Sequence, residues 1–180
     1  NSNDGILTRF FALEYAALFD VIKSGSAALG IPVPLGGTSN HFRAPVLRKV
    51  GLWDAWNVTE DADLGYRLAR YGYGVGDLAS DTLEEAPADP RAWMAQRTRW
   101  LKGYMQTWLV PMRDPGTLFR ELGPWGFASF QIMIGGTVLS ALVHPWFYAL
   151  VAFDGARGVF AAQPDSLLGL PVWTMAWINL

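Results

Sequence analysis

The 180-residue chain contains no cysteine and has almost no charge in its last third. Without cysteine it can form neither a disulfide framework nor a thiolate metal site. After Glu121 the charged residues are only Asp154, Arg157 and Asp165, and the formal net charge of the chain is −2. This slightly acidic balance is not that of a nucleic-acid-binding domain, so we expect no nucleic-acid partner. Aromatic residues make up 14% of the chain, which excludes disorder.

The uneven charge divides the chain into a polar part, residues 1–121, and an apolar part, residues 122–180. The chain opens at Asn1 and closes within an apolar run ending at Leu180. From these two ends we read it as an internal piece of a longer protein. We expect such a piece to be inactive when it is isolated.

The stretch from Leu122 to Phe153 contains no Asp, Glu, Lys or Arg. As a helix it is long enough to cross a hydrocarbon core of about 30 Å. We therefore expect a membrane span at about 125–152, with a helix kink or end near His144 before Pro145, and a second, truncated span starting near 167. The alternative is a helix buried inside a large soluble protein.

Basic residues dominate the segment that precedes the apolar stretch. Between Arg91 and Arg120 there are six basic residues and one acid, Asp114. Positive charge beside a span is typical of the cytoplasmic side. We expect a multi-pass protein of the plasma (inner) membrane with its polar part in the cytoplasm.

Apolar spacing and helix-breaking residues predict an α/β fold for the polar part. An extended segment, 31–35, leads into a glycine-rich loop, 36–40, and a short strand is expected over 75–79. Thr59 is expected to cap one of the helices and Gly25 to stop another. The predicted helices are 7–23, 45–50, 60–71 and an amphipathic helix over 90–110.

Acidic and basic residues form two consecutive clusters. Residues 54–89 contain nine acids and two bases, and the next thirty residues are strongly basic. Opposite charges across a cleft suit a reaction in which one side removes a proton and the other holds a phosphate. Two solvated helix faces of opposite sign are the alternative, and charge alone favours it.

The spacing of three residues within 90–110 points toward the ligand site. Gln96, Arg99 and Trp100 stand at i, i+3 and i+4, which places them on one face of a helix. Arginine binds pyrophosphate oxygens with paired N–H groups, and tryptophan stacks on the apolar face of a sugar ring. Arg97 and Lys102 are read as basic side chains that extend toward solvent.

Two motifs in this order resemble those of a known family. Thr59-Glu60-Asp61 is followed, after 34 intervening residues, by Gln96-Arg97-Thr98-Arg99-Trp100. This is similar to the TED and QxxRW pair of membrane-embedded family 2 glycosyltransferases, the group that contains cellulose, chitin and hyaluronan synthases. Gly37-Thr38-Ser39-Asn40 is similar in placement to that family's acceptor-side loop. The resemblance covers roughly residues 30–145.

The resemblance implies the C-terminal part of a GT-A (nucleotide-diphospho-sugar transferase) domain over residues 1–121, followed by transmembrane helices. It implies an inverting transfer from a nucleotide-sugar donor to a polysaccharide or lipid-linked acceptor. Asp61 would be the general base, with Glu60 beside it shaping the site. Because Asp61 lies in a first helical turn, we expect its carboxylate to be held in the charged form. The other implied contacts are donor-binding Gln96 and Arg99 and acceptor-binding Trp100, Gly37, Thr38 and Ser39.

The resemblance also implies a divalent cation, Mg²⁺ or Mn²⁺, for the intact enzyme. No Asp-x-Asp precedes residue 61, so we assign no metal ligand within this chain. Asp61-Ala62-Asp63 is read as the base plus a residue at the helix start, and Glu84-Glu85 as an exposed loop pair. The rival hypothesis is a catalytically silent membrane scaffold or binding subunit. Retention of Asp61, Arg99 and Trp100 together favours the enzyme.

Overall fold

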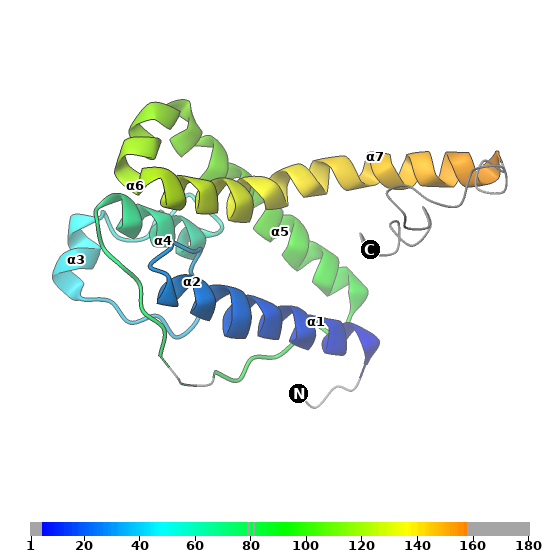
Figure 1. Ribbon diagram of the computed structural model, residues 1–180. Coiled ribbons are helices and arrows are strands. Elements are labelled where there is room, and N and C mark those ends of the chain that lie inside the picture. The colour runs from blue at the N-terminus through cyan, green and yellow to red at the C-terminus, as the bar shows by residue number, and fades with distance from the viewer. Residues whose placement is uncertain (1–4, 79, 81, 158–180) are drawn as a thin grey trace. The chain divides into compact units, whose positions relative to one another are not determined.

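The computed structural model describes residues 5–78, 80 and 82–157 (Figure 1), and the chain divides into two compact units, residues 1–139 and 140–180. The first part of the chain forms α1 (Ile6–Ala16), the π-helix η1 (Ala17–Lys23), α2 (Ser24–Ala28), α3 (Ala44–Lys49) and α4 (Glu60–Arg70). There follow α5 (Pro90–Leu109), the 3₁₀ turn η2 (Pro111–Arg113), α6 (Pro115–Phe130), the π-helix η3 (Gln131–Gly135) and α7 (Gly136–Ala156).

The two helices that carry the motifs lie where the sequence predicts them. α4 is followed by Gly72, whose φ of 77° is the left-handed conformation that commonly terminates helices. α5 begins at Pro90, and the Asp89 side chain accepts a hydrogen bond from the Ala92 N–H at 2.9 Å. A short helix before Gly51 is also confirmed as α3.

The expected end of the first helix at Gly25 is wrong. The helix continues through η1 into α2, and the chain turns only at Gly30, where φ is 65°. Gly25 lies in an open part of α2, and the Leu29 N–H still donates to its carbonyl at 3.1 Å. A helical glycine costs only about 1 kcal/mol relative to alanine, so a single one need not stop a helix.

The expected strand over 75–79 is not found in the described part of the chain. Residues 75–78 have no regular structure, and Ala79 lies outside the described residues. The extended segment 31–35 likewise has no strand beside it among the described residues. A strand needs a neighbour to accept and donate its ladder hydrogen bonds. The described residues are therefore helices, turns and loops, and the α/β prediction is not confirmed there.

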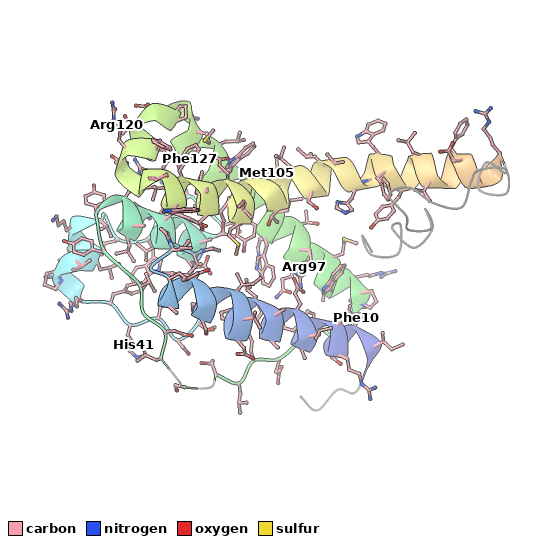
Figure 2. All side chains as sticks on the ribbon, viewed as in Figure 1. Phe10, His41, Arg97, Met105, Arg120 and Phe127 are labelled. Atoms are coloured by element: carbon pink, nitrogen blue, oxygen red, sulfur yellow. The ribbon has the colours of Figure 1, made fainter. Side chains whose placement is uncertain are left out.

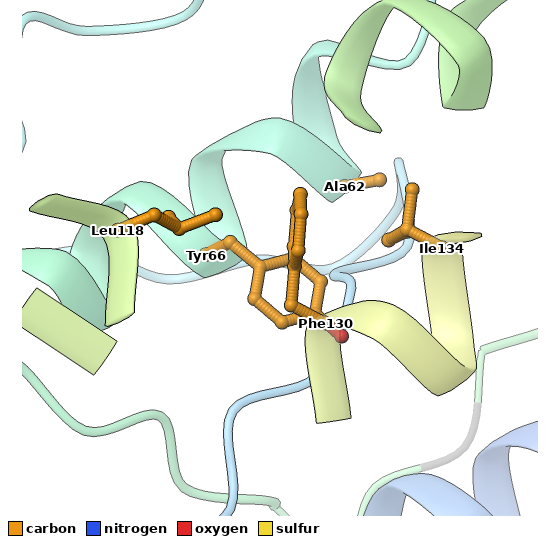
Figure 3. Close-up of a cluster of buried hydrophobic side chains, with 5 residues drawn as sticks. All are labelled: Ala62, Tyr66, Leu118, Phe130 and Ile134. Carbon is orange, nitrogen blue, oxygen red and sulfur yellow. The ribbon is translucent and has the colours of Figure 1, made fainter. Parts of the chain in front are cut away.

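The first unit has two apolar clusters, and α4 contributes to both. One joins α4 to α6 and η3, and the Tyr66 ring meets the Phe130 ring edge-on, with centroids 5.0 Å apart (Figure 3). The other joins α4 to α3 and the extended segment. The first cluster contains Ala62, Tyr66, Leu118, Phe130 and Ile134, and the second contains Leu35, Val50, Leu64 and Leu68.

Glycines allow two close approaches beside α4. A Cβ atom at Gly65 would lie 2.6 Å from the Val33 carbonyl oxygen, and one at Gly103 would lie 2.4 Å from Thr59 Oγ1. Real Cβ atoms do not approach other atoms so closely, so only glycine fits at both positions without a shift. The loop after residue 30 and α5 are thereby both held against α4.

Among the described residues there is one candidate membrane span. Residues Pro115–Ala156 are long and apolar enough to cross a membrane, by length and composition alone. Gly123, with φ 67° and ψ 176°, interrupts the helical geometry just before Pro124. Pro145 lies inside α7, so the expected helix end near His144 does not occur. The second span expected near 167 lies outside the described residues.

The start of this apolar run packs against α5, within the first compact unit, which ends at Leu139. Trp108 Nε1 donates to Gln131 Oε1 at 2.9 Å. A Cβ atom at Gly135 would lie 2.7 Å from the same indole nitrogen. α5 and η3 are thus in direct contact through one tryptophan.

Candidate active site

A cavity of about 410 Å³ brings the two motifs together. Its walls come from α1 and η1, from the loop that begins at Val33, from the start of α4 and from α5. The helices α1, α4 and α5 are labelled in Figure 1. Of the predicted site residues, Ser39 does not line the cavity. The others all do: Gly37, Thr38, Glu60, Asp61, Gln96, Arg99 and Trp100.

Ser39 is turned toward a different part of the chain. Its backbone has a φ of 56°, and its hydroxyl lies 2.6 Å from the Thr82 hydroxyl. Gly37, two residues earlier, comes close to the predicted base, because a Cβ atom there would lie 3.3 Å from Asp61 Oδ2. The glycine-rich loop therefore approaches Asp61 through its backbone.

The Asp61 carboxylate is half-buried in the cavity wall. Burial raises its pKa above the ordinary value, and the charge of Glu60 raises the pKa further, while a hydrogen bond from the Ala62 N–H lowers it. That N–H lies 2.7 Å from Asp61 Oδ1. The position at the helix start was expected to favour the charged form of Asp61, which would lower its pKa. That expectation is wrong, because burial raises the pKa by more than the Ala62 N–H lowers it. A raised pKa makes the ionised carboxylate a stronger base.

Three buried polar side chains connect the start of α4 to α5. Asn57 Nδ2 donates to Thr107 Oγ1 at 2.8 Å, and the Thr59 N–H donates to Asn57 Oδ1 at 3.1 Å. The Thr59 hydroxyl faces both partners at 3.4 Å and makes no capping bond to α4, so the predicted cap is wrong. The Thr59 hydroxyl is turned toward Asn57 and Thr107 and away from the N–H groups of α4. This cluster fixes the distance between Asp61 and α5.

α5 presents Gln96, Trp100 and Tyr104 to the cavity at steps of four residues. Gln96 Oε1 is buried and has no hydrogen-bond partner among the described residues. Trp100 lies near Tyr15 of α1, with ring centroids 6.5 Å apart. The pKa of Tyr104 is raised by burial and then by the nearby charge of Asp61, which places this phenol within electrostatic reach of the predicted base. Arg99 lines the cavity from a more exposed position.

Arg97 is not a solvated basic residue, contrary to prediction. Figure 2 labels Arg97 between α5 and α1, and its guanidinium makes two hydrogen bonds to the Glu14 carboxylate. The guanidinium carbon lies 4.8 Å from the Trp100 ring centroid and 5.3 Å from that of Trp93. The contacts of Arg97 with the two tryptophan rings could have been predicted from the sequence, because Trp93 and Trp100 stand at i−4 and i+3 from Arg97 on one helix. Glu14 could not be found in this way.

Glu84 also lines the cavity, although it is exposed as predicted. Burial, and then the charge of Glu84, raise the pKa of Tyr15 on the cavity wall to about 12. Glu85 does not line the cavity. The pair therefore has two different environments.

The described residues do not fit a metal centre. Within that part of the chain, no group of three His, Cys, Asp or Glu side chains is arranged to hold a metal ion. The cation implied by the resemblance has no assigned ligands here, and we derive no step through it.

Comparison with known proteins identifies the family. The model of glycosyl transferase family group 2 matches residues 1–156. The chain belongs to this family. Membership of glycosyl transferase family group 2 implies a GT-A nucleotide-sugar transferase fold and a glycosyltransferase. No solved structure gave a significant match to the chain.

Curated relatives match over part of their length. A probable glycosyltransferase, YdaM of Bacillus subtilis, is 30% identical over 104 residues, covering 57% of this chain and 25% of the relative. The poly-beta-1,6-N-acetyl-D-glucosamine synthase of Staphylococcus epidermidis is 27% identical over 114 residues, with the same two coverages. A protein called labda-7,13(16),14-triene synthase, of Streptomyces clavuligerus, is 32% identical over 105 residues, covering 58% of this chain and 29% of the relative. The chain spans about a quarter of the length of these relatives, and their names do not all describe one reaction.

Proposed function

We propose that the intact protein is an inverting glycosyltransferase that moves a sugar from a nucleotide-sugar donor to a glycan or lipid-linked acceptor at a membrane. The supporting observation is that Asp61, Gln96, Arg99 and Trp100 line one cavity although they come from two separate motifs. The name of the Staphylococcus epidermidis relative supports a polysaccharide acceptor.

In this proposal Asp61 accepts the proton of the acceptor hydroxyl. The freed oxygen attacks the anomeric carbon of the donor sugar as the bond to the nucleoside diphosphate breaks, and the diphosphate leaves with the electron pair. One displacement inverts the configuration at that carbon. Asp61 is suited to the step because burial raises its pKa, and a positioned base contributes about 10²–10⁴-fold to such a reaction.

Residues of α5 supply the binding contacts. The Arg99 guanidinium stabilises the negative charge that grows on the departing diphosphate. Gln96 is also assigned to the diphosphate of the donor. Its buried Oε1 has no hydrogen-bond partner among the described residues, so this oxygen can accept a hydrogen bond from a hydroxyl or N–H group elsewhere on the ligand. Trp100 stacks on the acceptor sugar, and the backbone of Gly37 and Thr38 closes the acceptor side next to Asp61.

The membrane location is part of the proposal. The run Pro115–Ala156 supplies the candidate span, and the basic residues before it favour a cytoplasmic position for the site. A cytoplasmic site gives access to soluble nucleotide-sugars. A lipid-linked or growing glycan acceptor would be held beside it by the bilayer.

The test compares Asp61→Asn with Asp63→Asn in the full-length protein. Asp63 is a matched control because it lies on the same helix turn, pairs with Arg67 at 2.6 Å and does not line the cavity. We expect Asp61→Asn to reduce sugar transfer by about 10²-fold or more while the nucleotide-sugar still binds. Asp63→Asn should retain transfer.

Two outcomes would contradict the proposal. An active Asp61→Asn enzyme beside an inactive but folded Asp63→Asn enzyme would mean that Asp61 is not the base. A wild-type protein that binds no nucleotide-sugar and transfers no sugar would favour the silent scaffold.

A further inference from the structure

The π-helix η1 forms a wall of the cavity without belonging to either motif. Its residues Leu18, Phe19, Ile22 and Lys23 all line the cavity. π-helical turns are uncommon and occur often at functional sites, since the extra residue per turn redirects side chains. The Phe19 ring contacts the glycine-rich loop, because a Cβ atom at Gly36 would lie 3.0 Å from it.

Three cationic side chains line the cavity, and their partners differ. Arg97 is bonded to Glu14. Arg99 and Lys23 have no ion pair among the described residues, and Lys23 Nζ lies 5.1 Å from the centroid of the Phe19 ring. The cavity therefore receives two unpaired cations, one from η1 and one from α5.

The carboxylates of the cavity favour a second cationic side chain beside an anionic ligand. Glu60, Asp61 and Glu84 line the same space, and each repels a phosphate group. A nucleoside diphosphate carries more than one negative charge, which Arg99 alone does not balance. Lysine binds phosphate as a point charge that can follow the oxygens on a flexible stem.

We propose that Lys23 is a second cationic contact for the diphosphate of the donor, acting together with Arg99. This inference rests on the proposed function, because it assumes that the cavity receives a nucleotide-sugar. It assigns a binding role to η1, a segment that neither motif includes.

The experiment measures equilibrium binding by calorimetry of the full-length protein in detergent. The probes are UDP and GDP, each compared with its nucleoside, and the nucleotide that the wild type binds is used for the variants. Lys23→Met should weaken binding of the diphosphate by about 10- to 100-fold, the loss of one charged hydrogen bond. It should leave binding of the nucleoside unchanged, and Lys23→Arg should restore most of the affinity for the diphosphate.

Lys49→Met is the matched control. Lys49 Nζ also lies over an aromatic ring, at 5.4 Å from the centroid of Tyr73, and donates to the Tyr73 hydroxyl at 3.1 Å, but it lies outside the cavity. Its substitution should change neither affinity. This control separates a local charge contact from a general loss of positive charge.

Each adverse outcome has its own meaning. Unchanged binding of the diphosphate to Lys23→Met overturns the role of Lys23 while the proposed function stands. An equal loss of affinity for diphosphate and nucleoside also overturns it, because Lys23 would then act only by packing on Phe19. A wild-type protein that binds neither UDP nor GDP overturns the proposed function and this inference with it.

Discussion

Two glycine-to-alanine substitutions should change stability in opposite directions. Gly25 and Gly103 both lie in helices with ordinary backbone angles. A Cβ atom at Gly25 would meet no atom within 4 Å, whereas one at Gly103 would lie 2.4 Å from Thr59 Oγ1 and 2.5 Å from Thr59 Cγ2. The same methyl group therefore enters open space in one case and the contact between α5 and α4 in the other.

The magnitudes follow from opposing contributions. Alanine favours either helix by up to about 1 kcal/mol over glycine. At Gly103, overpacking costs about 1–3 kcal/mol. If Thr59 moves away, the buried polar cluster with Asn57 and Thr107 loses hydrogen bonds, and an unsatisfied buried group costs about 1–3 kcal/mol more. We expect Gly103→Ala to destabilise by about 1–5 kcal/mol and Gly25→Ala to stabilise by up to about 1 kcal/mol.

Thermal unfolding followed by circular dichroism in detergent measures the difference between the two variants. Sugar transfer is measured at a temperature where both are folded. Gly103→Ala should also lower transfer, because the shift separates Asp61 from Arg99 and Trp100. The reasoning is refuted if Gly103→Ala is as stable as Gly25→Ala, since the close approach of α5 to Thr59 would then not exist.

Three further predictions concern the base, the acceptor and the membrane. Because burial raises the pKa of Asp61, its charged form destabilises the fold. Asp61→Asn should therefore be more stable than the wild type at pH 7, and the difference in stability should disappear below the ordinary pKa of 3.8. Thermal unfolding measured from pH 7 to below pH 3.8 tests this, and a difference that stays constant over that range would contradict it. Trp100→Ala should weaken acceptor use by about 1 kcal/mol or more with little change in donor affinity, and the reverse pattern in binding and kinetic assays would reassign Trp100. Cysteines introduced at Ser80 and Asp165 should react differently with an impermeant thiol reagent in intact cells; equal labelling, when both react after lysis, would argue against the topology.

The helices α3, α4 and α5 could be predicted because prolines, glycines and Asp89 start or end a helix through contacts with residues next to them in the sequence. The errors came from partners that are distant in sequence. The Thr59 hydroxyl turns to Thr107, 48 residues away, instead of capping α4. The helix does not end at Gly25, because the end of a helix depends on the packing around it as much as on one residue. The missing strand has the same cause, because no neighbour pairs with 75–78 in the described part.

The candidate site shows the same limit. Gln96, Arg99 and Trp100 were predicted together because helical spacing places them on one face. Glu14 binds Arg97 across 83 residues, and no local pattern brings them together. The raised pKa of Asp61 also depends on burial by the folded chain, which the position in a first turn does not reveal.

The bond between Trp108 and Gln131 bears on how the protein can be prepared. Trp100 and Trp108 are eight residues apart on one helix, about 12 Å, so the bond to Gln131 holds the same helix that carries the candidate ligand-binding residues. A soluble version truncated after residue 121 would lose Gln131 and would remove Phe130 and Ile134 from the core around Tyr66. Purification that strips the apolar segment, by truncation or proteolysis, should therefore abolish the proposed sugar transfer even though neither motif is cut. The site and the first turns of the apolar segment need to be expressed and purified together.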